Sequence, residues 1–62
     1  MPYVSIRVAG TLTRKQKKKI AKGVTQVIAQ ETGKPESSIL IFIDENQAEN
    51  IAKGGELLDE QS

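Results

Sequence analysis

The chain has 62 residues, a formal net charge of +1, and neither cysteine nor histidine. A chain this short forms a single domain, residues 1–62, and buries too little surface to be stable with ease on its own. Without cysteine there are no disulfides or thiolate metal sites, and without histidine there are no zinc–imidazole centres or histidine-activated nucleophiles. We therefore expect no metal site, and self-association is the remaining route to a stable fold.

Charge is distributed unevenly along the chain. Residues 1–34 carry eight basic side chains and one acid, a net charge of +7, whereas residues 35–62 carry one basic side chain and seven acids, a net charge of −6. Such asymmetry indicates either a nucleic-acid-binding patch or attraction between neighbouring subunits. The RKQKKK run at residues 14–19 raises the first possibility, but no aromatic residues interleave with it to stack on bases. A solvated helix face is therefore preferred, and we expect no nucleic-acid partner.

The chain also lacks a long apolar run. Neither a signal peptide nor a membrane span is predicted, since both require such a run. We therefore expect a cytoplasmic protein with no membrane partner.

The first half of the chain predicts a strand and then a helix. Residues 3–8 alternate between apolar and polar side chains, as in a strand with one apolar face, and a turn follows at residues 9–11. Thr13 and Gln16 fit a capping box, which predicts a helix over residues 14–32 that ends before Gly33 and Pro35. Four apolar residues recur at helical spacing and form one stripe: Ile20, Val24, Val27 and Ile28.

The second half predicts another strand and a short hairpin. Residues 39–43 read Ile-Leu-Ile-Phe-Ile, a run with strong strand propensity whose two faces must both be buried. Residues 46–55 are polar and predict a loop before a short terminal hairpin or strand. Because a helix connects the two main strands, they should be parallel and joined by a right-handed crossover. The fold class is therefore α+β, with a β-α-β protomer.

One helix can cover only one face of this sheet. Its stripe should meet the following strand residues: Val4, Ile6, Val8, Ile39, Ile41 and Ile43. Tyr3, Leu40 and Phe42 would then form an apolar patch on the uncovered face, which is unusual for so small a protein. We expect partner subunits to cover that face and to extend the sheet edge.

The order of these features resembles the small 4-oxalocrotonate tautomerases. An initial Met-Pro leads into a strand, and one amphipathic helix precedes the Gly33-x-Pro35 break. An apolar strand ending in Ile-Asp-Glu follows, and then a loop that closes on Gly-Gly-Glu-Leu at residues 54–57. The resemblance covers nearly the whole chain. It implies a homohexamer built as a trimer of dimers, and cofactor-free keto–enol tautomerisation of unsaturated 2-oxo acids such as 2-hydroxymuconate.

The resemblance implies that Pro2 is the catalytic base. If Met1 is removed, Pro2 becomes a secondary amine, and its neutral form can take a proton from a dienol hydroxyl and deliver it to carbon. An apolar pocket would favour that neutral form, because burial disfavours the cation. If Met1 stays, the nitrogen belongs to an amide and has no basicity.

The chain departs from the family where substrate would bind. The best-known members carry one arginine just before the helix and one in the second strand, where this sequence has Leu12 and Leu40. An aromatic pocket residue of the family corresponds to Ile51. Arg14, Arg7 and Lys53 are the candidate replacements for the missing cations. We therefore expect weak activity on dicarboxylates or a less charged substrate.

Two further interpretations remain open. The missing arginines are also consistent with a non-catalytic, oligomeric binding module of the same fold. The relatives implied by the resemblance include hydratase-like dehalogenases, which need a residue that activates water, and no glutamate of this chain stands out for that role.

Overall fold

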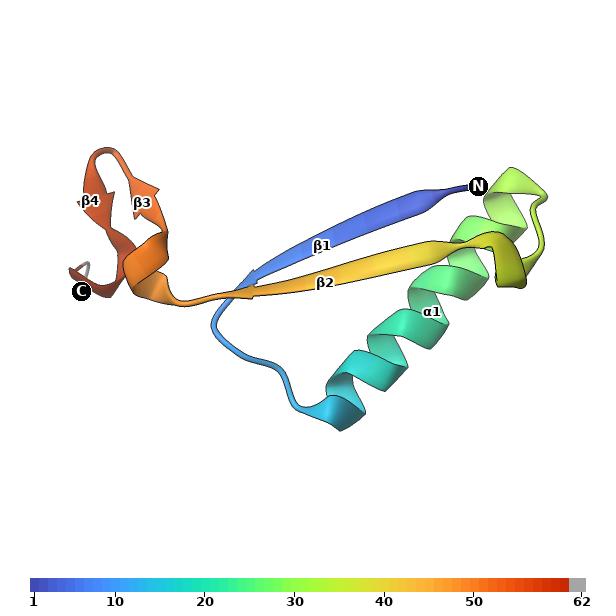
Figure 1. Ribbon diagram of the computed structural model, residues 1–62, viewed down its shortest axis with the longest axis horizontal. Helices are drawn as coiled ribbons and strands as arrows, with labels where there is room; N and C mark the ends of the chain where they lie inside the picture. Colours follow the sequence, from blue (N-terminus) through green and yellow to red (C-terminus); the bar gives the residue numbers. More distant parts are fainter. Residues whose placement is uncertain (61–62) are drawn as a thin grey trace.

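The structure is a computed structural model that describes residues 1–60. Its main elements, in chain order, are β1 (Tyr3–Ala9), α1 (Arg14–Thr32), β2 (Leu40–Asn46), β3 (Ala52–Lys53) and β4 (Glu56–Leu57). β1 and β2 pair in parallel, and β3 and β4 form an antiparallel hairpin (Figure 1). The structure thus confirms the predicted α+β class, with its β-α-β arrangement and C-terminal hairpin.

The helix begins and ends where its capping residues predict. The Thr13 hydroxyl accepts a hydrogen bond from the Gln16 backbone N–H at 3.1 Å, and the Gln16 side chain accepts one from the Thr13 N–H at 2.9 Å. Gly33 follows the last turn with φ of 71°, and its N–H donates to the Ala29 carbonyl. A left-handed residue at this position favours glycine, because other side chains clash there. These two caps explain why α1 spans residues 14–32.

The second strand is longer than residues 39–43 and begins one residue later. Ile39 is extended but caps a short 3₁₀ turn, Glu36–Ser38, so pairing with β1 starts at Leu40. Beyond Ile43 the strand continues through Asp44, Glu45 and Asn46, and the predicted polar loop therefore begins later. Strand propensity argues against these three polar residues. They stay in the ladder because β1 extends to Ala9 and pairs with them in register.

The two faces of the strand pair differ as predicted. Val4, Ile6, Val8, Ile41 and Ile43 are half-buried on the side that α1 covers. The residues between them leave an apolar surface uncovered: Tyr3 is 69%, Leu40 43% and Phe42 53% exposed. The Tyr3 and Phe42 rings meet edge to face, with centroids 6.2 Å apart. We call Tyr3, Leu40 and Phe42 the open apolar face. As expected for a sheet that one helix covers on one side, this face of β2 stays uncovered within the single chain.

The helix stripe is also only partly covered. Ile20, Val24 and Ile28 are half-buried, but Val27 is 58% exposed. These four residues, with Lys19 and Gly23, line an open groove of about 460 Å³. The prediction that Val27 meets the sheet is therefore wrong in the isolated chain, because the sheet has only two long strands and does not reach beneath it.

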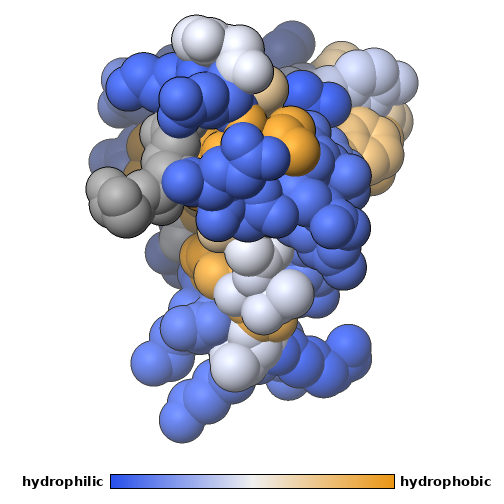
Figure 2. Space-filling model, turned by 90° about the vertical axis from the view of Figure 1, so that its left-hand side faces the viewer, coloured by the Kyte–Doolittle hydropathy of each residue, from blue (hydrophilic) through white to orange (hydrophobic). Residues whose placement is uncertain are grey.

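The single chain has no buried core. None of residues 1–60 is fully buried, and the radius of gyration is 14.8 Å, whereas a compact chain of this length has about 11 Å. The molecule is elongated, 43 × 24 × 14 Å, and the hairpin projects beyond the end of the strand pair that lies away from the N-terminus (Figure 1). Seen from the hairpin end, apolar residues reach the surface between hydrophilic ones (Figure 2). Such a chain needs partner copies to bury its apolar residues.

Most of the basic run on α1 is exposed, but Lys17 is half-buried. Lys15, Lys18, Lys19 and Lys22 are all exposed, as a solvated helix face requires. Among residues 1–60 there is no helix with the length and apolar composition that a membrane span requires.

Candidate active site

Pro2 lies immediately before β1, at the end of the strand pair where β2 begins. Its side chain is half-buried, and its carbonyl accepts a hydrogen bond from the Leu40 N–H at 3.0 Å. This bond fixes Pro2 beside Leu40 and next to the start of the open apolar face. Met1, by contrast, is 74% exposed, so the bond that joins it to Pro2 lies at the accessible tip of the chain. Cleavage of that bond would leave a secondary amine on a rigid strand end with apolar neighbours.

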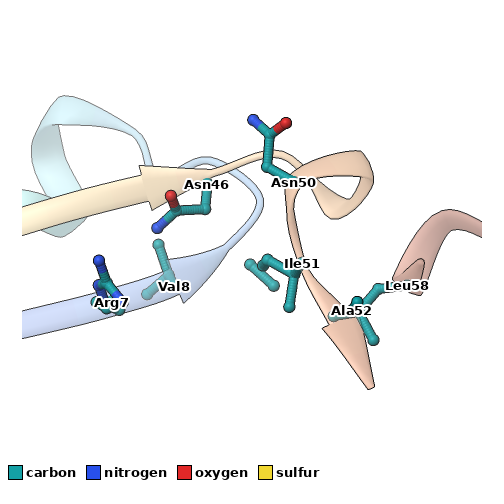
Figure 3. A pocket seen from close by; sticks show the side chains of 8 residues that line it. Arg7, Val8, Asn46, Asn50, Ile51, Ala52 and Leu58 are labelled. Carbon is teal, nitrogen blue, oxygen red and sulfur yellow. The ribbon is translucent and has the colours of Figure 1, made fainter. Parts of the chain in front are cut away.

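A cavity lies at the opposite end of the strand pair. It measures about 520 Å³ and is lined by residues from β1, from β2, from the segment that leads into the hairpin and from just after it: Arg7, Val8, Ala9, Asn46, Asn50, Ile51, Ala52 and Leu58 (Figure 3). We call it the distal cavity. Of the residues that the sequence analysis singled out, Arg7 and Ile51 line it, whereas Lys53 lies in β3 opposite Glu56.

Arg14 and Leu12 belong to a third region, the start of α1. Arg14 is exposed, and Figure 1 shows the chain's N-terminus near the other end of the helix. Leu12 is half-buried, and its N–H donates to a carboxylate oxygen of Glu45 at 2.8 Å. The resemblance places an arginine near Leu12, but the structure has an acidic side chain beside it.

Glu45 and Lys17 form an ion pair between β2 and α1. The Lys17 Nζ lies 2.5 Å from a Glu45 carboxylate oxygen, and both side chains are partly shielded from solvent. The Lys17 hydrogen bond, and then the one from the Leu12 N–H, lower the pKa of Glu45 below its ordinary value. Glu45 therefore stays charged at neutral pH and ties β2 to both α1 and its leading loop.

One chain thus brings Pro2 and Leu40 together at one end of the strand pair, and Arg7 and Ile51 together at the other. β1 has seven residues, so its two ends lie about 20 Å apart at roughly 3.3 Å per residue. Ile51 and Lys53 belong to the far end, and they can approach a Pro2 only if that proline comes from another copy of the chain.

Sequence reasoning missed two features. It did not find the Lys17–Glu45 pair, and it did not place Asn46 and Asn50 with Arg7 around one cavity. The available signal was the parallel pairing, which brings the carboxyl ends of both strands to one edge, where ligands of open parallel sheets commonly bind. Within residues 1–60, no three acidic side chains converge as a metal ion would require.

Comparison with known proteins gives consistent matches. A family model described as tautomerase enzyme matches residues 2–61. A probable tautomerase of Bacillus cereus is 38% identical over 61 residues, covering 98% of this chain and all of the relative. The 2-hydroxymuconate tautomerase of Bacillus subtilis is 33% identical over 58 residues, covering 94% of each chain. A solved structure, described as a homologue of 4-oxalocrotonate tautomerase, superposes with a TM-score of 0.91 at 30% identity, covering 98% of this chain and all of the other.

Proposed function

The chain belongs to the tautomerase family, and from that membership we propose that it is a cofactor-independent tautomerase whose base is the amine of Pro2. The reaction is the conversion of the dienol form of an unsaturated 2-oxo acid into its keto form. The observation that carries the proposal is the position of Pro2, held at the strand end by the Leu40 N–H and bordered by apolar side chains.

The proposed mechanism needs one proton carrier. The neutral amine of Pro2 takes the proton from the substrate hydroxyl, electrons shift along the conjugated carbons, and the same proton returns to a carbon atom. Apolar neighbours help, because they disfavour the charged amine and keep the base free to accept a proton near neutral pH. Met1 must first be removed, since an amide nitrogen cannot do this chemistry.

The substrate class follows from the relatives and from the leucines. The Bacillus subtilis relative is named for 2-hydroxymuconate, a dicarboxylate. Leu12 and Leu40 are both apolar, so neither side chain can pair with an anion. An unpaired carboxylate in such surroundings is costly. We therefore expect weaker turnover of dicarboxylates than of substrates with one carboxylate.

We propose that the active protein is a homo-oligomer, a hexamer built as a trimer of dimers. Three features support assembly: the missing core, the open apolar face, and the groove around Val27 on α1. The strongly basic first half and the acidic second half also favour contacts between copies. Assembly would bring the distal cavity of one copy, with Ile51 and Lys53 at its end of the fold, to Pro2 of another.

The second candidate is an oligomeric binding module without catalysis, which the leucines at positions 12 and 40 favour. One experiment separates the two. Two samples of the same chain, one retaining Met1 and one freed of it by an aminopeptidase, are verified by intact mass. Both are then assayed for ketonisation of 2-hydroxymuconate and phenylenolpyruvate.

A tautomerase should gain at least about 100-fold in rate when Met1 is removed, the lower range for a positioned general base. The two samples differ by Met1, and its removal is what makes the Pro2 nitrogen basic. Sedimentation checks separately whether both samples assemble in the same way. Equal and negligible rates in both samples would reject catalysis on these substrates and leave the binding module.

A further inference from the structure

The distal cavity contains the chemistry of a carboxylate site. Its volume, about 520 Å³, suits a small organic ligand. Arg7 is the one charged side chain among the described residues that line it, and Asn46 and Asn50 add polar groups (Figure 3). The rest of the lining is apolar, chiefly Ile51 and Leu58. A cavity with one cation and an apolar wall fits a ligand with one carboxylate and a hydrocarbon tail.

In the single chain the Arg7 guanidinium is only weakly engaged, and it lies on the same side of the strand pair as the open apolar face. Its nearest acid is Asp44, the residue opposite it in the strand register, and the Nε–Oδ2 distance is 4.0 Å. That separation is too long for a hydrogen bond. Both side chains are largely exposed, 80% for Arg7 and 51% for Asp44, so the pair is weakly held. A ligand carboxylate that meets two guanidinium N–H groups at once would bind more strongly than Asp44 does.

The other cations near the predicted site are engaged elsewhere. Lys17 is paired with Glu45, which also accepts a hydrogen bond from the Leu12 N–H, so this lysine already has a partner. Lys53 lies opposite Glu56 in the hairpin and takes part in interactions of its own. Arg14 lies exposed at the start of α1 and does not line the cavity.

We propose that Arg7 binds the carboxylate of the substrate in the distal cavity, and that this single guanidinium makes the protein selective for monocarboxylates. The inference rests on the proposed function for its substrate class, an unsaturated 2-oxo acid with an apolar tail. The tail would lie against Ile51 and Leu58, and the reacting carbons would meet Pro2 of a neighbouring copy. Arg7 would be a specificity-determining residue, since it holds the acid group and leaves proton transfer to the amine.

The test compares two ligands of equal shape and different charge. Trans-cinnamate carries a carboxylate, and cinnamamide carries a neutral amide in its place. Their dissociation constants are measured with the Met1-free protein by following backbone amide shifts of Val8 and Ala52, which line the cavity. The variants are Arg7→Gln, Arg7→Lys and a matched control, Lys22→Gln, which removes an exposed charge on α1.

Arg7→Gln should weaken the binding of cinnamate about tenfold, the lower range for a charged hydrogen-bonded pair at an exposed site. The binding of cinnamamide should not change. The dissociation constant of cinnamate for Arg7→Lys should lie between those of the wild type and Arg7→Gln, because lysine keeps the charge but loses the paired N–H groups. Lys22→Gln should match the wild type. Equal weakening of both ligands by Arg7→Gln, or no weakening of cinnamate, would overturn the proposal.

The outcome is independent of whether the protein is an enzyme. If Arg7→Gln leaves cinnamate binding unchanged while removal of Met1 still switches on turnover, this inference fails and the proposed function stands. If cinnamate binding needs Arg7 but Met1 removal brings no turnover, the proposed function fails and the carboxylate site stands. Because the Arg7 side chain is 80% exposed, neither variant should disturb the fold, which circular dichroism can check.

Discussion

Replacing Phe42 by alanine should weaken assembly strongly. Phe42 belongs to the open apolar face, and 53% of it is exposed in the single chain. A phenylalanine side chain buries about 200 Å² when covered, so a partner would remove about 100 Å² of Phe42 from water. At about 25 cal/mol per Å², that burial contributes about 2.5 kcal/mol per protomer.

In a symmetric dimer the loss of burial energy occurs twice, once in each copy. In a dimer in which each copy buries its own Phe42, the loss would be about 5 kcal/mol, or between three and four orders of magnitude in the dissociation constant. Sedimentation velocity over a dilution series measures this shift directly. Phe42→Leu is the matched control, because leucine retains most of the apolar area and should shift the constant far less.

One result would refute this reasoning. If Phe42→Ala assembles over the same concentration range as the wild type, the open apolar face is not a subunit interface. Assembly would then have to depend on another surface, such as the groove around Val27 on α1.

Two further predictions concern the stability of the protomer. Thr13→Ala should lower the free energy of unfolding by about 1 kcal/mol, because the Gln16 N–H loses its acceptor; urea unfolding at fixed protein concentration measures this, and Thr13→Ser should restore most of it. The pKa of Glu45 is lowered from its ordinary 4.5 by Lys17 and the Leu12 N–H. Ionised Glu45 therefore adds to the free energy of unfolding fully above about pH 4.5, and this contribution is lost as the pH falls through the pKa of the folded state. In the Glu45→Gln variant the melting temperature should therefore decrease less between neutral and acidic pH than in the wild type. The same decrease in both proteins would contradict the role of the Lys17 pair.

The helix was predictable because its signals are local. Thr13, Gln16 and Gly33 mark its two ends through contacts within four residues along the chain, so neighbouring residues determine both boundaries. The alternation of β1 was equally readable, since a strand with one covered face repeats every two residues.

The end of β2 was not predictable in the same way. Asp44, Glu45 and Asn46 are poor strand formers, yet they pair with β1, and Glu45 also reaches Lys17, 28 positions earlier in the chain. Such long-range contacts override propensity, and they leave no local pattern to read. The same reason explains the distal cavity, whose residues come from four separate segments.

The sequence by itself determined the elements and their order, because these depend on short-range spacing. It also determined that one apolar face stays uncovered, because the sheet has two faces and a single helix can cover only one. It also indicated Pro2 as the residue able to act as a base. Only the tertiary structure decided that Pro2 and the distal cavity lie at opposite ends of β1. The physical reason is the rigid parallel pairing of β1 with β2, which holds the two ends about 20 Å apart. The site proposed above, with Pro2 beside the distal cavity, therefore needs a second copy of the chain.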